Sequence, residues 1–381
     1  MLRTHILNQL DRKRIGQRNL AKIAGVSEST ISRFLNDRDE LNFESILKIV
    51  KFLFPEKEKE YIEEYATTQK SMNARYCMEY CMIHRLWHIT EGIIATLYDS
   101  TNPLDREWAR VYELELLRVN KRIEYGELLT ELKRYYPKAI EVQILHTFVT
   151  AYAYYDMNKH SLLYDLLEGL DQQIEQVKSP FMRDCFNIRL GLLLNRYFLL
   201  QNKVEQAREY SYKVINQDVA EHVKGLAYLY LGESYLYEDY ETGKAHIEKA
   251  YLIFVDTERA ENARHAQQSL SFLQSYWKVD REFLLELDSD RAVVEYSHYL
   301  LGKDEKVEAK KMLDTIDVEN LPDWDKGFFY YSLGLLEKHE LAFHYSVKWF
   351  KKTENAFHLQ LALHELKKME TNEVLLEILN L

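Results

Sequence analysis

The stretch QRNLAKIAGVSESTISRFLN, residues 17–36, decides the organisation of the N-terminal part of this chain. Its spacing of small and apolar residues is typical of a helix-turn-helix, in which two short helices pack at a steep angle. Gly25 lies where the chain must reverse, because glycine adopts a positive φ at little cost. Ser27 is placed to cap the second helix, and Ile31 and Phe34 give that helix a buried face. The pattern therefore predicts a helix that enters the major groove of DNA.

The exposed positions of this second helix are the expected points of contact with bases. Arg33 can chelate guanine, and Glu28 can accept a hydrogen bond from cytosine. Basic residues around the motif would hold phosphates without reading sequence. A helical hairpin that docks on another protein is the alternative, and the basic flank favours DNA. The predicted DNA-binding residues are Arg18, Lys22, Ser27, Glu28, Ser29, Ser32, Arg33 and Arg38.

Charge is unevenly distributed along the chain. Residues 1–55 contain ten Lys and Arg against six Asp and Glu, whereas the whole chain of 381 residues has a net charge of −11. The remainder therefore carries −15. A small basic head on a large acidic body predicts two kinds of partner, phosphates for the head and a cationic ligand for the body.

Composition places the chain among helical proteins of a reducing compartment. Twelve Gly and five Pro are few for this length, which favours an all-α fold. No apolar run approaches the roughly 18 residues of a membrane span, so we expect no membrane association. The first residues lack the apolar core of a signal peptide, and three cysteines do not make a disulfide framework. We expect a cytoplasmic protein.

The rest of the head reads as short helices. A first helix is predicted over residues 2–13, before the helix-turn-helix pair. Asn42 caps a later helix whose apolar residues from Ile46 to Phe52 recur at helical spacing and mark one buried face. Pro55 ends this helix, because the residue before a proline is pushed out of the α region.

Paired helices recur from about residue 74 to the C-terminus. Ala207, Ala245 and Ala309 occupy the same point in three second helices, where a small residue permits close helix contact. Gly232 fits the first-helix pattern of a tetratricopeptide repeat, whose period is about 34 residues. We therefore predict a degenerate superhelix of roughly eight hairpins, with a groove lined by tyrosine-rich first helices that suits a peptide.

The predicted architecture is all-α with a C-terminal helix that caps the repeats and joins two copies. The apolar surface of this last helix is larger than a cap that packs on the repeats with one face needs. The predicted dimerisation residues are therefore Leu375, Leu376, Ile378 and Leu379. A plain hydrophobic cap is the alternative. The predicted segments are a helix-turn-helix DNA-binding domain at 1–55, a linker helix at 56–73, a tetratricopeptide-like peptide-binding domain at 74–370 and a dimerisation helix at 371–381.

One candidate metal site is rejected on geometry. Cys77, Cys81, His84 and His88 fall on one face of a helix, but at 1.5 Å per residue they span about 16 Å. One straight helix cannot wrap four ligands around an ion, so buried cysteines beside packed histidines are the expected reading. Phosphate loops, nucleophile elbows and Cys–His pairs with motif context are also missing from the sequence. We expect no metal, no cofactor and no enzymatic activity.

Several segments resemble one family of regulators. They are MNARYCMEYCMIHRLW (72–87), REWARVY (106–112), VTAYAYYD (149–156) and WFKKTENAFHLQLALHELKKM (349–369). With the leucine-rich last helix, they make the chain similar to quorum-sensing regulators of the Rap, NprR, PlcR and PrgX superfamily. Within it, the chain resembles the AimR (arbitrium receptor) family of temperate Bacillus phages.

The resemblance implies a specific function. Such receptors are dimeric transcription factors of the host bacterial cytoplasm that bind double-stranded operator DNA and promote the lytic programme by activating a neighbouring gene. A secreted and re-imported hexapeptide ending in Arg-Gly-Ala binds the repeat groove and turns activation off, which favours lysogeny. By position, the resemblance implies peptide contacts from Arg196, His222, Glu233, Glu295 and Asn355.

Two alternative functions stay open from the sequence. A Rap-like phosphatase or response-regulator antagonist would use the groove without DNA, and the intact helix-turn-helix argues against it. A repeat scaffold that binds proteins would use the head merely for docking. A salt-dependent gel shift distinguishes it, since the affinity of a DNA-binding head falls steeply with salt.

Overall fold

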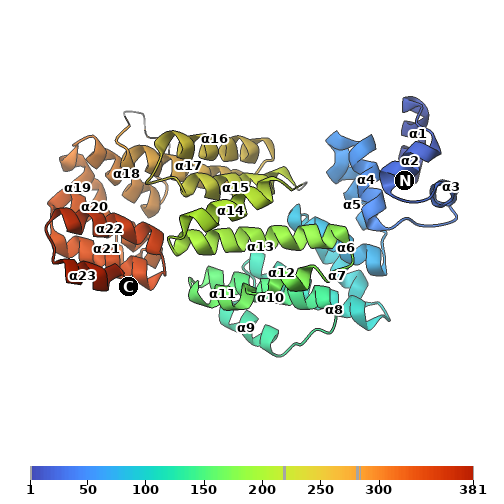
Figure 1. Ribbon diagram of the computed structural model, residues 1–381, viewed down its shortest axis with the longest axis horizontal. Helices are drawn as coiled ribbons and strands as arrows, with labels where there is room; N and C mark the ends of the chain where they lie inside the picture. Colours follow the sequence, from blue (N-terminus) through green and yellow to red (C-terminus); the bar gives the residue numbers. More distant parts are fainter. Residues whose placement is uncertain (1, 218–219, 280–282, 284, 381) are drawn as a thin grey trace. The chain divides into compact units, whose positions relative to one another are not determined.

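A computed structural model describes residues 2–217, 220–279, 283 and 285–380, and Figure 1 shows its helices. The regular elements of these residues are helices, with no strand among them, which confirms the predicted all-α class. None of the described helices combines enough length and apolarity to cross a membrane. The chain divides into two compact units, of which unit 1 comprises Met1–Ala153 and Gly169–Phe186, and unit 2 comprises Tyr154–Glu168 and Asn187–Leu381.

Unit 1 contains the predicted head and the helices that follow it. The bounds of its first helix equal those predicted from the sequence. In chain order the helices are α1 (Leu2–Lys13), α2 (Gln17–Ala24), α3 (Glu28–Leu35), α4 (Phe43–Leu53), the 3-10 helix η1 (Pro55–Lys57), α5 (Glu58–Ala66), α6 (Ser71–Ile83), α7 (Trp87–Tyr98), α8 (Pro103–Val119), α9 (Tyr125–Lys133), most of α10 (Ile140–Asp156) and α12 (Leu170–Ile174).

Unit 2 contains the repeats of the C-terminal half. Its helices are α11 (Ser161–Leu167), most of α13 (Pro180–Leu200), α14 (Val204–Ile215), α15 (Glu221–Glu233), α16 (Tyr240–Asp256), α17 (Ala260–Tyr276), α18 (Asp290–Gly302), α19 (Lys306–Asp314), the 3-10 helix η2 (Val318–Asn320), α20 (Asp323–Glu337), α21 (Glu340–Lys352), α22 (Ala356–Lys368) and α23 (Glu373–Asn380).

Helices α2 and α3 form the predicted helix-turn-helix. α2 ends at Gly25, whose φ of 71° is the left-handed conformation that the turn requires. The Ser27 hydroxyl accepts a hydrogen bond from the backbone N–H of Thr30 at 3.1 Å, so it caps α3 as predicted. Phe34 and Leu35 are buried on the inner face of α3. The local signals in the sequence therefore produce the motif.

Helix α4 has the predicted cap and a different buried face. The Asn42 side chain accepts a hydrogen bond from the N–H of Ser45 at 2.8 Å. Phe52, however, is 47% exposed, so the expectation that it belongs to the buried face is wrong. The buried stripe instead continues from Val50 to Leu53, because three residues bring a side chain back to the same face.

Three hydrogen bonds connect the start of α4 to the helices that follow it. Tyr65 Oη and Asn73 Nδ2 both donate to the carbonyl oxygen of Leu41, at 3.3 Å and 3.0 Å. Asn73 Oδ1 accepts from the N–H of Phe43 at 3.0 Å. Helix α5, within the predicted linker 56–73, buries one face. The units are defined by compactness, so the predicted domain boundaries stay a prediction.

The repeats of unit 2 pack through small residues at helix contacts. Helices α15, α16 and α17 lie side by side, each against its chain neighbour (Figure 1). Ala207 and Ala309 are fully buried as predicted, but Ala245 is exposed and its predicted role is wrong. Gly243 makes the contact instead, since a Cβ added there would lie 3.3 Å from the carbonyl oxygen of Gly232.

The stripe of cysteines and histidines at residues 77–88 is divided between two helices. α6 ends before Arg85, whose φ of 58° turns the chain, and His88 belongs to α7. The assumption of a single helix is therefore wrong. Cys77 and Cys81 are buried as expected. Burial raises the pKa of the Cys77 thiol and raises that of Cys81 to about 12, so neither is a reactive thiol.

Candidate functional site

The outer face of the helix-turn-helix presents the side chains expected to meet DNA. The polar residues of α3 are accessible because Ile31, Phe34 and Leu35 take the inner face of this two-turn helix. Basic side chains of α2 and of the segment after α3 are exposed as well. Contact with DNA stays a prediction for these accessible residues, which are Arg18, Lys22, Ser27, Glu28, Ser29, Ser32, Arg33 and Arg38.

Several of these side chains, Ser27 and Arg33 among them, already have partners within the head. The Ser27 hydroxyl caps α3 and lies 2.9 Å from Ser29 Oγ and 2.7 Å from Thr30 Oγ1. Arg33 Nη2 lies 2.6 Å from Asp39 Oδ2. Ser27 therefore fixes the start of the helix, and Arg33 is held beside the surface that would face a base pair.

A buried ion pair connects α13 and α15 in unit 2. Arg196 Nη1 donates to Glu233 Oε2 at 2.6 Å, and Arg196 Nε donates to Tyr155 Oη at 3.2 Å. The guanidinium also lies 5.4 Å from the ring centre of Tyr230 and 5.9 Å from that of Trp324. These contacts fix the orientation of Arg196 through both hydrogen bonds and aromatic faces.

The Glu233 carboxylate has partners on both oxygens. Its Oε1 accepts from Ser269 Oγ at 2.8 Å and lies 3.3 Å from His265 Nε2. Burial acts to raise the pKa of Glu233, but the positive charge of Arg196 and the hydrogen bonds outweigh it and hold the pKa well below its usual range. Glu233 is therefore an ionised residue that anchors Arg196.

A second cluster joins α18 and α20. Arg291 Nε donates to Glu295 Oε1 at 2.9 Å, and Arg291 Nη1 donates to Asp325 Oδ1 at 2.7 Å. The other oxygen of Glu295, Oε2, is buried and has no hydrogen-bond partner among the described residues. Burial raises the pKa of Glu295, and Arg291 opposes this only in part. One arginine thus serves two carboxylates.

The remaining two predicted peptide contacts lie at helix starts. Asn355 Oδ1 accepts from the N–H of His358 at 3.0 Å and caps α22, while its buried Nδ2 finds no partner within the described part of the chain. His222 is buried in the first turn of α15, about 16 Å along the helix from Glu233. The structure therefore joins Arg196 and Glu233 directly, and places His222 three turns away.

His358 lies close to both charged clusters. Burial and the positive charges of Arg196 and Arg291 lower the pKa of His358 to about 3, so its ring is neutral. Its Nδ1 is paired with the Tyr237 hydroxyl, and its ring centre lies 5.7 Å from that of Trp324. The clusters and these aromatic rings form one largely buried, polar and aromatic region, which we call the charged groove after the groove predicted from the sequence.

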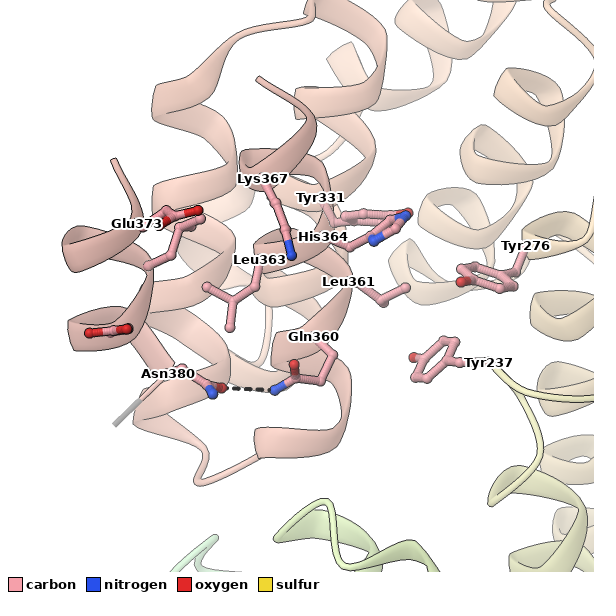
Figure 2. A pocket seen from close by; sticks show the side chains of 12 residues that line it. Tyr237, Tyr276, Tyr331, Gln360, Leu361, Leu363, His364, Lys367, Glu373 and Asn380 are labelled. Carbon is pink, nitrogen blue, oxygen red and sulfur yellow. Dashed lines mark hydrogen bonds between the residues drawn. The ribbon is translucent and has the colours of Figure 1, made fainter. Parts of the chain in front are cut away.

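A cavity of about 770 Å³ adjoins this region at Tyr237. Figure 2 shows Tyr237 and Tyr276 on one side, Glu373 and Asn380 of helix α23 on the other, and the side chains of α22 between them. Gln360 of α22 donates to Asn380 Oδ1 of α23 at 3.0 Å, which fastens the last helix to the cavity wall. This cavity therefore offers space for a ligand beside the charged groove.

Helix α23 divides the four predicted dimerisation residues between two faces. Leu375 and Ile378 are 38% and 57% exposed, in agreement with a face that another copy could cover. Leu376 and Glu377 line the cavity instead, and Leu379 is half-buried. Dimerisation itself stays a prediction.

Comparisons with known proteins match both parts of the chain. A helix-turn-helix family model matches residues 10–54, and a model described as AimR transcriptional regulator-like matches residues 58–368. The chain belongs to the AimR transcriptional regulator-like family. It is therefore a DNA-binding transcriptional regulator of the AimR type, with the helix-turn-helix as its DNA-binding element.

Relatives and solved structures agree with this family. The AimR transcriptional regulator of Bacillus phage SPbeta is 27% identical over 365 residues, which cover 94% of each chain. The solved structure of SeMet-phAimR has a TM-score of 0.79 at 25% identity and covers 100% of both chains. The solved structure of phAimR with a ligand has a TM-score of 0.76 at 25% identity, and covers 87% of this chain and 98% of that one.

Sequence reasoning missed several residues of the charged groove. Arg291 had a usable signal, because it precedes Glu295 by four residues and such pairs face each other on a helix. Asp325, His265 and Tyr155 had none, since their partners lie on other helices.

Proposed function

We propose that this chain activates a phage lytic programme, and that a short peptide bound in the charged groove switches this activation off and favours lysogeny. Three things support the proposal. The chain belongs to the AimR family, a phAimR structure holds a ligand, and the groove has the buried charges that a peptide needs. The peptide we propose ends in Arg-Gly-Ala.

The observation that carries the peptide proposal is a pair of unsatisfied buried atoms. Glu295 Oε2 is an acceptor and Asn355 Nδ2 is a donor, and neither has a partner among the residues described. A buried polar group without a partner costs about 1–3 kcal/mol. A peptide with an arginine and backbone amides supplies both missing partners, and the excess of carboxylates over arginines favours its positive charge.

The proposed peptide site has different roles for its two glutamates. Glu233 is saturated by Arg196, Ser269 and His265, so it holds the groove together. Glu295 Oε2 has no partner among the described residues, so it would accept hydrogen bonds from the arginine of the peptide. Arg196, His222 and Asn355 complete the proposed contacts.

We further propose that the chain acts as a homodimer joined through α23. Leu375 and Ile378 expose an apolar face there, and two joined copies would present two recognition helices to two half-sites. The peptide would act by population shift, because it must bind one arrangement of the heads more tightly than the other.

The peptide half of the proposal is tested by calorimetry. Synthetic hexapeptides ending in Arg-Gly-Ala are titrated into the full chain, and each is compared with its Lys-Gly-Ala and Gln-Gly-Ala analogues. We expect binding for an arginine peptide and a loss of at least tenfold for Glu295→Gln, because the buried acceptor charge is removed. Glu248→Gln on the exposed face of α16 is the matched control. Equal affinity for arginine and glutamine peptides would contradict the proposal.

The DNA half is tested by gel shift on duplexes selected from random sequence. Arg33→Ala is expected to abolish specific binding and to leave peptide affinity unchanged, since Arg33 lies in the head and contacts Asp39. A peptide that binds in the calorimetric test is then added to the complex of the wild-type protein with DNA. It is expected to change the amount of shifted DNA. An Arg33→Ala protein that selects the same sequences as wild type would show that α3 is not the reading helix.

A further inference from the structure

The second cluster of the groove is short of positive charge. Arg291 is the shared partner of two carboxylates, Glu295 at 2.9 Å and Asp325 at 2.7 Å. Two carboxylates that compete for one cation within a buried site do not both ionise easily. A proton on Glu295 would relieve this competition.

Helix position decides which carboxylate takes the proton. Asp325 lies in the first turn of α20, where the helix dipole stabilises a negative charge. Glu295 lies in the middle of α18 and has no such help, and its Oε2 is buried without a partner in the described chain. Its side chain is 5% exposed against 13% for Asp325. Burial raises the pKa of Glu295, which agrees with Glu295 as the proton carrier.

Other charged groups around Glu295 do not replace the proton. On α17, Arg264 is paired with Asp288, and His265 points its Nε2 at Glu233. On α18 itself, burial lowers the pKa of His298 to about 4, so its ring is neutral. Among the described residues, Arg291 is the cation in contact with Glu295.

We propose that Glu295 holds a proton while no ligand is bound and releases it when a ligand cation binds at Oε2. Asp325 is a positioning residue. It shares the positive charge of Arg291 with Glu295, and this sharing determines the pH at which Glu295 exchanges its proton for the ligand cation. The inference rests on the proposed function of the groove as a receptor for a cationic peptide. The proton leaves to the buffer, and the ligand cation takes its place.

The ligand arm measures the pH dependence of binding. A synthetic Arg-Gly-Ala hexapeptide is titrated into the full chain between about pH 5 and 7.5, in buffers of different ionisation enthalpy. For wild type, proton release is expected, and Kd falls by up to about tenfold per pH unit across the exchange. Glu295→Gln should bind weakly and without this slope. Asp325→Asn should move the slope to lower pH, since Arg291 then serves Glu295 alone.

The ligand-free arm uses thermal unfolding at pH 5 and pH 7. A raised pKa means that ionised Glu295 destabilises the fold, so Glu295→Gln gains most over wild type at pH 7 and the gap narrows at pH 5. Failure of every peptide to bind would overturn the proposed function. The ligand-free arm would still show whether Glu295 is protonated in the folded protein. A gap of equal size at both pH values overturns the inference. So does a binding slope that persists in Glu295→Gln and disappears in His265→Asn.

Discussion

The packing of α15 on α16 yields a prediction whose size follows from the structure. A Cβ added to Gly232 would lie 2.6 Å from Ile247 Cγ1, 2.9 Å from the Gly243 carbonyl oxygen and 2.9 Å from the Ile247 backbone nitrogen. Two of these are backbone atoms, so the two helices must separate. Overpacking costs about 1–3 kcal/mol, and alanine recovers about 0.5–1 kcal/mol over glycine within a helix. Gly232→Ala is therefore expected to lower the free energy of unfolding by about 1–2 kcal/mol.

The matched control lies in the same unit. At Gly302, the last residue of α18, a Cβ would meet the Ser275 carbonyl oxygen at 3.4 Å, an ordinary contact. Gly302→Ala is expected to be neutral or to stabilise by up to about 0.5 kcal/mol. Urea unfolding followed by circular dichroism measures both variants. If Gly232→Ala is as stable as Gly302→Ala, the reasoning about close helix contact is refuted.

The same variant has a functional consequence. Glu233 follows Gly232 directly, and its Oε2 lies 2.6 Å from Arg196 Nη1. A separation of α15 from α16 displaces this carboxylate, so Gly232→Ala is expected to weaken peptide binding, whereas Gly302→Ala is expected to leave it unchanged. Calorimetry with the hexapeptide measures the difference.

Three further predictions concern charge. Burial lowers the pKa of both His160 and His298 to about 4, so each stabilises the fold above pH 6.5 and this stability is lost as pH falls toward 4, by about 3 kcal/mol each. Thermal unfolding should show a flatter pH dependence for His298→Gln; an unchanged profile would argue against it. Arg196→Met leaves Glu233 buried without its cation and should cost about 3–5 kcal/mol, which a second change, Glu233→Gln, should largely restore. Equal stability of the single and double variants in urea would contradict this. Lys22→Ala should reduce the slope of log K against log salt in DNA binding by about 1 if Lys22 contacts a phosphate, and an identical slope would remove it from the interface.

The head was predictable because its determinants are local. Gly25 adopts the turn conformation itself, and Ser27 and Asn42 each cap a helix by accepting a hydrogen bond from the backbone N–H three residues later. The structure shows each in its predicted role. Phe52 shows the limit of such reasoning, since several apolar residues of α4 compete for one face and packing decides between them.

The groove was predictable only in outline. Arg196 and Glu233 are 37 residues apart in the sequence and lie on different helices. Arg291 and Asp325, which also pair, are 34 residues apart. Charged residues at such distances have many possible partners, and degenerate repeats do not show which helix faces which. Family resemblance indicated the positions. Only the three-dimensional structure shows that Glu233 is saturated and that Glu295 Oε2 has no partner among the described residues.

The buried thiols have a practical consequence. Cys77, Cys81 and Cys185 are all the cysteines of the chain, and all three are buried. A single cysteine introduced at an exposed position such as Ser29 would therefore take up a maleimide dye selectively. Two labelled copies in one assembly would then report the distance between recognition helices by energy transfer, with and without peptide.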